Sequence, residues 1–350
     1  MTAFKLHVMA CGHGDTLLLQ MPKRKWALID CHLPGNDARA RFFKYADSLG
    51  IRRLEYIVLT HPDSDHYKGM RQVLERYASN GRAIGYFCAP GGSPTHVMKL
   101  LESRGLSDDD VEEYAALFRT VNDLRNRRLL KRHALNDQVA TIRITGKRKG
   151  FSIVAVGPDY DRLASAEDAA LAKISHQPMN ANDCSVVLVA QYVSRFASHR
   201  FFLRGDMVGA GLTQALARWD GHSDNIEKVR TFDLVKAAHH GSKNGHDLAV
   251  AARIARKGSS VVVVSCGTLY NLPSRNVLAD YLANGWKVFC TSPRTTQGKP
   301  RSALQATSRG ASATFNPLVY DICVTAGRFG GLSATPAAAQ IQVHQLAFYK

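Results

Sequence analysis

The sequence predicts an α/β (α+β) fold in which mixed sheets are flanked by helices, and two patterns support this prediction. Short apolar runs rich in β-branched residues recur along the chain, and patterns with a helical period separate several of them. Many neighbouring strand-like runs are joined by gaps of hairpin length, which indicates mixed rather than purely parallel sheets. The 350 residues are 45% hydrophobic, enough to bury a sizeable core.

The same patterns assign the elements in chain order. Residues 4–8 alternate between apolar and polar like a half-buried strand, whereas residues 56–59 form a continuous apolar run. We expect strands at 4–9, 16–20, 26–30, 54–60, 84–88, 138–145, 151–156, 185–192, 200–204, 232–238, 260–265, 286–291, 318–325 and 340–348. We expect helices at 66–79, 95–104, 109–133, 161–173, 209–219, 247–256 and 274–284. One domain would span 1–325 with a helical insertion at about 95–135, and 326–350 would add a C-terminal strand and extension.

The chain is strongly basic. It has 46 lysine and arginine residues against 29 aspartate and glutamate residues, a formal net charge of +17. This excess favours a polyanionic partner such as nucleic acid, or an anionic substrate; a basic surface without such a role is the alternative. Several cations of 125–133 would share one helix face, as a phosphate-backbone contact or as an ordinary solvated surface. The basic tips at 22–25 and 146–150 are typical of solvated turns.

Composition also predicts the compartment. No run approaches the roughly 20 apolar residues needed to span a bilayer, and the first residues lack the apolar core of a signal peptide. The seven cysteines are scattered and form no Cys-x-x-Cys pair, as in reduced core cysteines. We therefore expect a soluble cytoplasmic protein with no membrane contact.

The densest chemistry lies in His61-Pro62-Asp63-Ser64-Asp65-His66. This segment offers two imidazoles and two carboxylates directly after the apolar run at 56–59. Loops at strand ends are where α/β folds place reactive groups. The segment therefore predicts a metal site that is catalytic rather than structural.

Two further strand ends carry matching residue types. The run 200–204 ends in Gly205-Asp206, where the glycine permits a tight exit, and the run 232–238 ends in His239-His240. Alone, a Gly-Asp pair is usually a turn and a His-His pair is often structural. Together, the three strand ends provide enough ligands for two metal ions that share a bridging carboxylate. Zinc and manganese both fit this mixture of carboxylates and imidazoles.

These motifs resemble the metallo-β-lactamase superfamily, and within it the branch typified by the C-terminal domain of the competence protein ComEC and by phosphorylcholine esterase. The resemblance covers most of residues 4–292. The segment 61–66 is similar to the superfamily's His-x-His-x-Asp-His loop, with aspartate in the second ligand position. Asp206 matches the bridging aspartate, and His239 matches the first histidine of the branch's His-His-Gly-Ser motif. Residues 11–15, Asp30 and 182–188 resemble further segments of the branch.

The resemblance implies an αββα sandwich with a metal cleft along one edge. It implies two divalent metal ions, Zn²⁺ or Mn²⁺, held by His61, Asp63, Asp65, His66, Asp206 and His239. Asp15 and Asp30 would brace the ligand loop, and Asp183 could complete the first metal site. The implied reaction is attack of a metal-bridging hydroxide on a phosphodiester, with Asp65, His240 and Lys243 as catalytic residues and DNA as the favoured substrate.

One departure bears on the reaction. The branch usually has a histidine where this chain has Leu272, and that histidine is thought to contact the phosphate or to assist the leaving group. Its loss leaves the metal ligands intact but removes a proton donor. His240 or Lys243 could take over the support of the leaving oxygen.

Two other functions fit the same sequence. The first is hydrolysis of a small phosphodiester, such as a cyclic nucleotide or a phosphocholine-type ester, which a deep pocket would favour over an open groove. The second is a module without catalysis that binds nucleic acid or a partner protein through its basic surface. Clustered buried carboxylates repel one another without a cation, which argues against the second. The sequence sets no oligomeric state.

Overall fold

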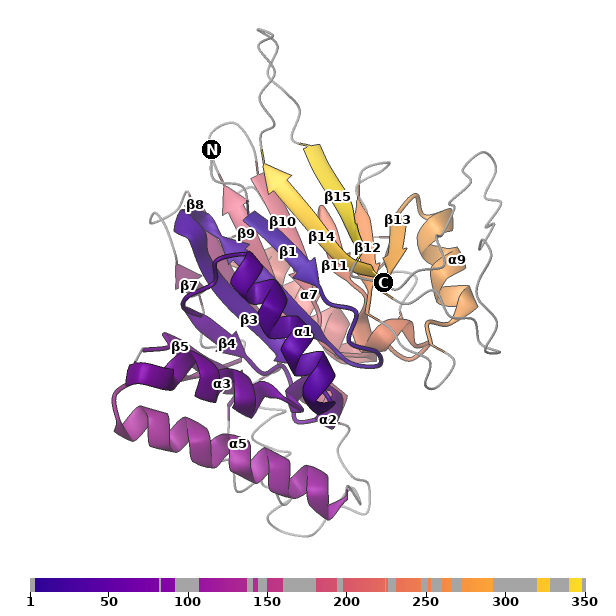
Figure 1. Ribbon diagram of the computed structural model, residues 1–350. Helices are drawn as coiled ribbons and strands as arrows, with labels where there is room; N and C mark the ends of the chain where they lie inside the picture. Colours follow the sequence, from indigo (N-terminus) through magenta and orange to yellow (C-terminus); the bar gives the residue numbers. More distant parts are fainter. Residues whose placement is uncertain are drawn as a thin grey trace, which may run out of the picture.

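Two sheets pack face to face and helices cover both outer faces of the pair (Figure 1). This computed structural model describes residues 4–81, 83–91, 107–136, 141–143, 150–159, 181–193, 198–223, 225, 231–246, 251–252, 260–265, 272–291, 320–327 and 340–347. The layers follow the order helix, sheet, sheet, helix, which confirms the predicted mixed α/β class.

The first sheet has the strand order β15-β14-β1-β2-β3-β4-β5-β6. Its strands are β1 (Phe4–Val8), β2 (Thr16–Met21), β3 (Lys25–Cys31), β4 (Tyr56–Val58), β5 (Tyr86–Pro90), β6 (Lys131–Leu135), β14 (Tyr320–Gly327) and β15 (Gln340–Ala347). Strands β3 to β6 are mutually parallel, and the other neighbours pair antiparallel. The carboxyl ends of β3 and β4 therefore lie side by side at one edge of the sheet.

The second sheet has the order β13-β12-β11-β10-β9-β8-β7. Its strands are β7 (Thr141–Arg143), β8 (Gly150–Gly157), β9 (Val187–Val193), β10 (Ser198–Leu203), β11 (Leu234–Lys236), β12 (Val261–Val264) and β13 (Lys287–Cys290). Strands β10 to β13 are parallel, so their carboxyl ends also share an edge. Hydrogen bonds join the edges of the two sheets. The amide of Val186 donates to the Thr60 carbonyl at 2.9 Å, and the Ser265 hydroxyl donates to the Gly14 carbonyl at 2.7 Å.

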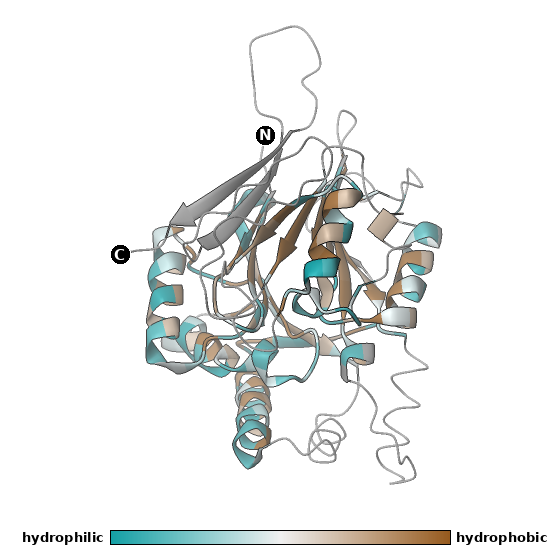
Figure 2. Ribbon diagram, turned by 90° about the vertical axis from the view of Figure 1, so that its right-hand side faces the viewer, coloured by the Kyte–Doolittle hydropathy of each residue, from teal (hydrophilic) through white to brown (hydrophobic). Residues whose placement is uncertain are grey.

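Each sheet buries both faces, and the alternation along single strands shows how. Leu28 of β3 packs toward the helices and Ile29 packs toward the second sheet, because successive side chains point to opposite faces. In β12 the same alternation sends Val263 between the sheets and Val262 toward the outer helices. Figure 2 shows the result as brown, apolar strands between helices whose outer faces are teal.

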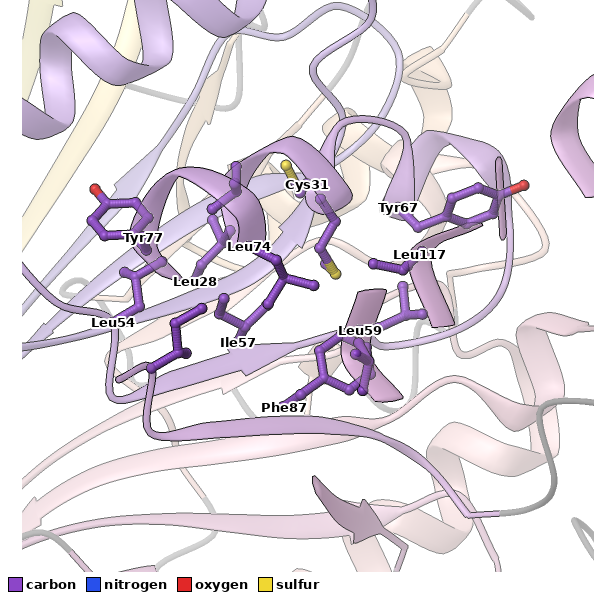
Figure 3. Close-up of a cluster of buried hydrophobic side chains, with 14 of the residues drawn as sticks. Leu28, Cys31, Leu54, Ile57, Leu59, Tyr67, Leu74, Tyr77, Phe87 and Leu117 are labelled. Atoms are coloured by element: carbon purple, nitrogen blue, oxygen red, sulfur yellow. The ribbon is translucent and has the colours of Figure 1, made fainter. Parts of the chain in front are cut away.

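The helices lie on the two outer faces. The first sheet is covered by α1 (Gly35–Ser48), α3 (Met70–Ala78) and α5 (Asp108–Asn126), and the short α2 (Ser64–Tyr67) precedes α3. The second sheet is covered by α7 (Gly209–Gly221) and α9 (Arg275–Ala283). Figure 3 shows the apolar cluster under α3 and α5, where Leu74 and Leu117 pack over Ile57 and Phe87 of the sheet.

Most expected strands are confirmed, and two differences have a physical reason. Residues 131–133 were expected at the end of a helix but belong to the edge strand β6, because α5 ends at Asn126 and Arg128 adopts a φ of +59°. Helix α1 was not expected at all. It buries only Phe42, Tyr45 and Ala46, a narrow apolar stripe among charged residues that gives a weak periodic signal.

Other expectations are only partly covered. The expected helices at 95–104 and 161–173 lie outside the described residues, and of 247–256 only 251–252 are described. The expected domain boundary at 325 falls within β14, which pairs with β1, and β15 continues the same sheet. The division at that point stays a proposal. Among the described residues, no helix combines the length and the apolar composition that crossing a bilayer requires.

Candidate metal centre

The loop after β4 holds its four candidate ligands in a compact turn. Asp63 stands at the amino end of α2, and Asp65 and His66 lie in its first turn. The helical turn brings His66 back toward His61, so that the two ring centroids are 4.0 Å apart. Both imidazoles are fully buried, whereas the side chains of Asp63 and Asp65 are partly exposed.

Asp206 enters the centre from the end of β10 through a glycine that no other residue can replace without strain. Gly205 has a φ of +50°, and a Cβ there would lie 2.3 Å from the Ser185 hydroxyl oxygen. The amide of Asp206 donates to that same hydroxyl at 3.0 Å. The close approach of the β10 exit to Ser185 fixes the aspartate in the buried interior.

The paired histidines after β11 take different positions. His239 and His240 have φ values of +46° and +51°, so the chain turns sharply between them. His240 is fully buried, and its Nε2 lies 3.1 Å from Asp65 Oδ2 and 3.4 Å from Asp206 Oδ2. His239, the ligand expected from sequence, is half-buried at the wall of a cavity, and its buried Nδ1 has no hydrogen-bond partner. Its role as a ligand stays a prediction.

Asp65, His66, Asp206 and His240 form one possible ligand group, with one ligand atom of each within 4.8 Å of all the others, and Asp15, Asp30 and His66 form another. His66 Nε2 lies 3.5 Å from Asp206 Oδ2 and 3.9 Å from Asp65 Oδ2. Two ligands of a tetrahedral ion with bonds of about 2.1 Å are separated by about 3.4 Å. The spacing of the four atoms therefore suits one divalent ion between them.

His61 and Asp63 extend the centre on the other side of Asp206. His61 Nε2 lies 3.5 Å from Asp63 Oδ2 and 4.0 Å from Asp206 Oδ2. The same Asp206 oxygen thus faces both halves, as a bridging ligand would. The side chain of Asp183, the expected additional ligand, lies outside the described residues.

Hydrogen bonds fix the orientation of the three buried imidazoles. Asp30 Oδ2 accepts from His66 Nδ1 at 2.7 Å and from the Thr60 hydroxyl at 2.7 Å. The Thr60 oxygen lies 3.0 Å from His61 Nδ1, from which it can accept because its own proton goes to Asp30. His240 Nδ1 lies 3.1 Å from the Ser265 carbonyl, which can only accept. All three rings therefore carry their proton on Nδ1 and present Nε2 to the centre.

A buried ion pair lies behind the ligands. Lys236, the last residue of β11, pairs with Asp15, and its Nζ lies 3.6 Å from Asp206 Oδ1. Both members of the pair are fully buried. Burial opposes the charged form of Lys236, but Asp15 and Asp206 outweigh that effect and raise its pKa. Asp15 thus holds the lysine, and Asp30 holds the histidines, in agreement with the bracing roles expected for them.

Electrostatics at the centre favour the ionised carboxylates. Burial would raise the pKa of Asp206, but the surrounding His240, His66 and Lys236 hold it well below its ordinary value. Burial opposes the charged form of His66 as well, and the carboxylates of Asp206 and Asp30 raise its pKa well above the usual range. The negative charge of the carboxylates is therefore stabilised by nearby positive charge. Protons on the imidazoles supply that charge when no other cation is present.

The residues present fit a pair of divalent cations. Three buried ligand atoms make no hydrogen bond: His61 Nε2, His66 Nε2 and Asp206 Oδ1. The five carboxylates of Asp15, Asp30, Asp63, Asp65 and Asp206 outnumber the one ammonium group of Lys236. Unsatisfied buried donors and excess negative charge are both relieved by a bound cation.

A cavity of about 650 Å³ opens beside the centre. Its lining comprises His13, His239, Ser242, Lys243, Asn244, Leu272, Ser274, Arg275 and Asn276. His13 joins it to the centre, because its Nε2 lies 3.6 Å from Asp65 Oδ2 and its ring centroid 4.5 Å from that of His240. Burial and the nearby His240 lower the pKa of His13 to about 4, so it is neutral at pH 7. Leu272 faces the same cavity at the position where a histidine was expected.

The expected basic clusters lie elsewhere. Lys131 begins β6 and Arg24 ends the 3-10 turn (Pro22–Arg24) that leads into β3, so both mark the amino edge of the parallel strands. His61 follows the carboxyl end of β4, at the opposite edge. Among the described residues, the lysine and arginine that line the cavity beside the centre are Lys243 and Arg275, which no sequence pattern had singled out together. The tip at 146–150 lies almost wholly outside the described residues.

Part of the chain matches a known family. The family model described as "Metallo-beta-lactamase superfamily" matches residues 9–84, which contain the ligand loop and its Asp30 brace. No curated protein matches. Among solved structures, the metallo-beta-lactamase fold protein YhfI from Bacillus subtilis is 14% identical, with a TM-score of 0.43 over 82% of this chain and 96% of that one.

Two further solved structures are also similar to the chain. A diphosphatase from the PhnP family is 14% identical, with a TM-score of 0.42 over 82% of this chain and 94% of that one. The short form of human tRNase Z is 14% identical, with a TM-score of 0.33 over 66% of this chain and 77% of that one. With scores this low, the structures add no detail of the site. The family match covers the ligand loop and its Asp30 brace, within residues 9–84.

Proposed function

We propose that this chain is a metal-dependent hydrolase of phosphodiester bonds, centred on Asp206 and the ligands around it. One observation carries the proposal. His61, His66 and His240 come from two strand ends of different sheets, yet each presents Nε2 toward Asp206 while a hydrogen bond holds its Nδ1. A histidine cluster with this uniform orientation serves a cation better than it serves packing.

The metal ligands we propose are His61, Asp63, Asp65, His66, Asp206 and His240, with His240 replacing His239 in the set expected from sequence. Two divalent cations, zinc or manganese, would supply Lewis acidity that neutralises phosphoryl oxygens and makes water more acidic. Asp206 would hold the two positions at a fixed separation. Asp30 and the Ser265 carbonyl would keep the imidazoles in the tautomer that can bind.

The cavity side of the centre would handle the leaving group. We propose His240 as a ligand rather than as a donor there, because its Nδ1 faces the Ser265 carbonyl and its Nε2 faces Asp65. Lys243 is exposed on the cavity wall and His239 lines the same wall, so these residues could donate to the departing oxygen. Leu272 leaves this task to them because it has no proton to give.

DNA is the substrate we propose first, since the net charge of +17 favours a polyanion. A small phosphodiester is the second candidate, and the cavity favours it. Its volume of about 650 Å³ lies within the range of pockets that enclose small ligands. We also propose the ComEC-like branch as the position of the chain within the superfamily, on the strength of its Asn-Asp-x-Ser and His-His-Gly-Ser segments.

The test is hydrolysis by protein that has been stripped of metal and reloaded with Mn²⁺ or Zn²⁺. Bis(p-nitrophenyl) phosphate reports phosphodiester cleavage, and single-stranded and supercoiled DNA report nuclease activity. Asp206→Asn should lose at least 100-fold in kcat/KM, whereas Asp109→Asn, the same change at an exposed carboxylate of α5, should match the wild type. Equal activity of all three proteins would refute the proposal. Metal uptake without any hydrolysis would favour the binding module.

A further inference from the structure

The cavity beside the metal centre has a chemistry of its own. Two of its lining residues, Lys243 and Arg275, are cationic, and both are exposed. None of the described residues that line it is acidic. The remaining lining is mostly amide and hydroxyl groups, which can donate hydrogen bonds to oxygen. This is the composition of a site for an anion rather than for an apolar group.

The cations come from two different segments that the fold brings together. Lys243 follows the His-His-Gly-Ser motif at the end of β11, and Arg275 lies at the start of α9. Asn244 and Asn276 stand next to them in sequence and line the same cavity. Each segment thus contributes one cation and one amide to a shared wall.

None of the proposed metal ligands lines the cavity, but the cavity adjoins the metal centre. The cavity reaches the centre through His13, which lies 3.6 Å from Asp65, and through His239, the neighbour of His240. A phosphodiester held at the centre would therefore extend into the cavity with one of its two substituents.

We propose that Arg275 and Lys243 form a second phosphate subsite, so that the substrate carries another phosphate close to the bond that is cleaved. This inference rests on the proposed function, because it takes the scissile phosphate to lie at the metal centre. The shared chemistry is a nucleotide phosphate. It could be the next phosphate of a DNA strand or the second phosphate of a small nucleotide. Arginine suits this role because its guanidinium binds phosphate oxygens in pairs.

Binding, rather than turnover, tests the subsite most cleanly. Calorimetry with manganese-loaded protein would compare thymidine 3′,5′-bisphosphate with thymidine 5′-monophosphate. The bisphosphate should bind at least tenfold more tightly to the wild type, because a hydrogen bond to a charged group contributes about that much. Arg275→Gln should reduce this preference to about threefold or less, and Arg275→Lys should retain an intermediate preference. Arg52→Gln, which removes an exposed cation at the far edge of the first sheet, should leave the preference unchanged.

Equal affinity of the wild type for the two nucleotides would overturn the subsite, as would a preference that survives Arg275→Gln. The two proposals fail separately. A preference that depends on Arg275 in a protein that cleaves no diester would remove the hydrolase but keep the subsite. Hydrolysis of a diester by a protein that does not prefer the bisphosphate would keep the hydrolase and remove the subsite. A ten-residue oligothymidylate added as competitor separates the sources: tighter binding than the bisphosphate indicates DNA, and weaker binding indicates a small nucleotide.

Discussion

Asp30 Oδ2 lies 2.7 Å from His66 Nδ1, and the same carboxylate accepts from both the amide and the hydroxyl of Thr60. Asp30 stands at the end of β3 with a φ of +55°, a conformation that aspartate and asparagine tolerate better than most residues. One carboxylate therefore sets the orientation of His66 directly and of His61 through Thr60.

This relationship predicts that Asp30→Asn weakens metal binding without changing a ligand. Asparagine keeps the shape and tolerates the backbone but loses the charge that makes His66 a strong base. Zinc affinity, measured by competition with a chelating dye, should fall roughly 10- to 100-fold. Asp47→Asn, at an exposed carboxylate of α1 that pairs with Arg76, is the matched control. If both variants bind zinc as the wild type does, Asp30 has no such role.

Substitutions of His239 and His240 should have different effects on metal content and activity. His240→Gln should lower the bound metal by about one equivalent, because a buried ligand of the group with Asp65, His66 and Asp206 is lost. His239→Gln should keep the metal content of the wild type and lose activity, since His239 lines the cavity. Elemental analysis of the two dialysed variants, together with kcat and KM, makes the comparison. The opposite pattern would restore the assignment expected from sequence.

A comparison of Gly205→Ala with Gly209→Ala distinguishes the cost of backbone strain from the cost of steric overlap. Both have a φ of +50°, but a Cβ at 205 would lie 2.3 Å from the Ser185 oxygen, whereas a Cβ at 209 would meet nothing within 4 Å. Each alanine variant should lose about 1–2 kcal/mol of unfolding free energy from the left-handed conformation. Gly205→Ala should lose a further 1–3 kcal/mol or so from overlap and should also displace Asp206 and its metals. Urea unfolding and metal content report the two effects; similar losses in both variants would show that the overlap relaxes freely.

His7 predicts a dependence of stability on pH that is independent of the metal ligands. Burial, and then the charge of Lys5, lower the pKa of His7 to about 3, and its Nδ1 lies 2.7 Å from the Tyr45 hydroxyl. The unfolded chain, with an ordinary pKa of about 6.5, binds more protons between these values, so stability falls as pH falls through that window.

Replacing His7 removes this dependence. The loss of unfolding free energy between pH 7.5 and pH 4.5 should be smaller by about 2 kcal/mol in His7→Gln than in the wild type. Urea titrations of the metal-free protein at the two pH values measure it. Tyr45→Phe removes the hydrogen bond but leaves the imidazole buried, so it should keep the full pH dependence. Identical pH dependence in His7→Gln and the wild type would show that His7 is protonated in the fold.

The sequence predicted the layered fold and the ligand loop because both are local patterns. The sequence of each strand shows directly which of its side chains are apolar and can be buried. The segment from His61 to His66 places four candidate ligands within six residues. The difference between His239 and His240 depends instead on two consecutive positive φ values, after which His240 is fully buried and His239 is half-buried. No local pattern reports that turn.

Long-range contacts account for the other misses. Lys236 reads as an ordinary strand residue, and only the approach of Asp15 from the other sheet makes it a buried counter-ion. Arg275 and Lys243 stand 32 positions apart and meet through the cavity alone. Strand β6 was missed because its charged residues continue the pattern of α5, although β5 pairs with it in parallel.

The central claim is that Asp206 joins two metal positions. An anomalous difference map from zinc-loaded crystals tests it most directly. The account predicts two peaks that share Asp206, at about 2.0–2.2 Å from its oxygens, one beside His61 and Asp63 and the other beside Asp65, His66 and His240. A fully loaded crystal with no peak at Asp206, or with zinc bound only at other residues, would contradict it.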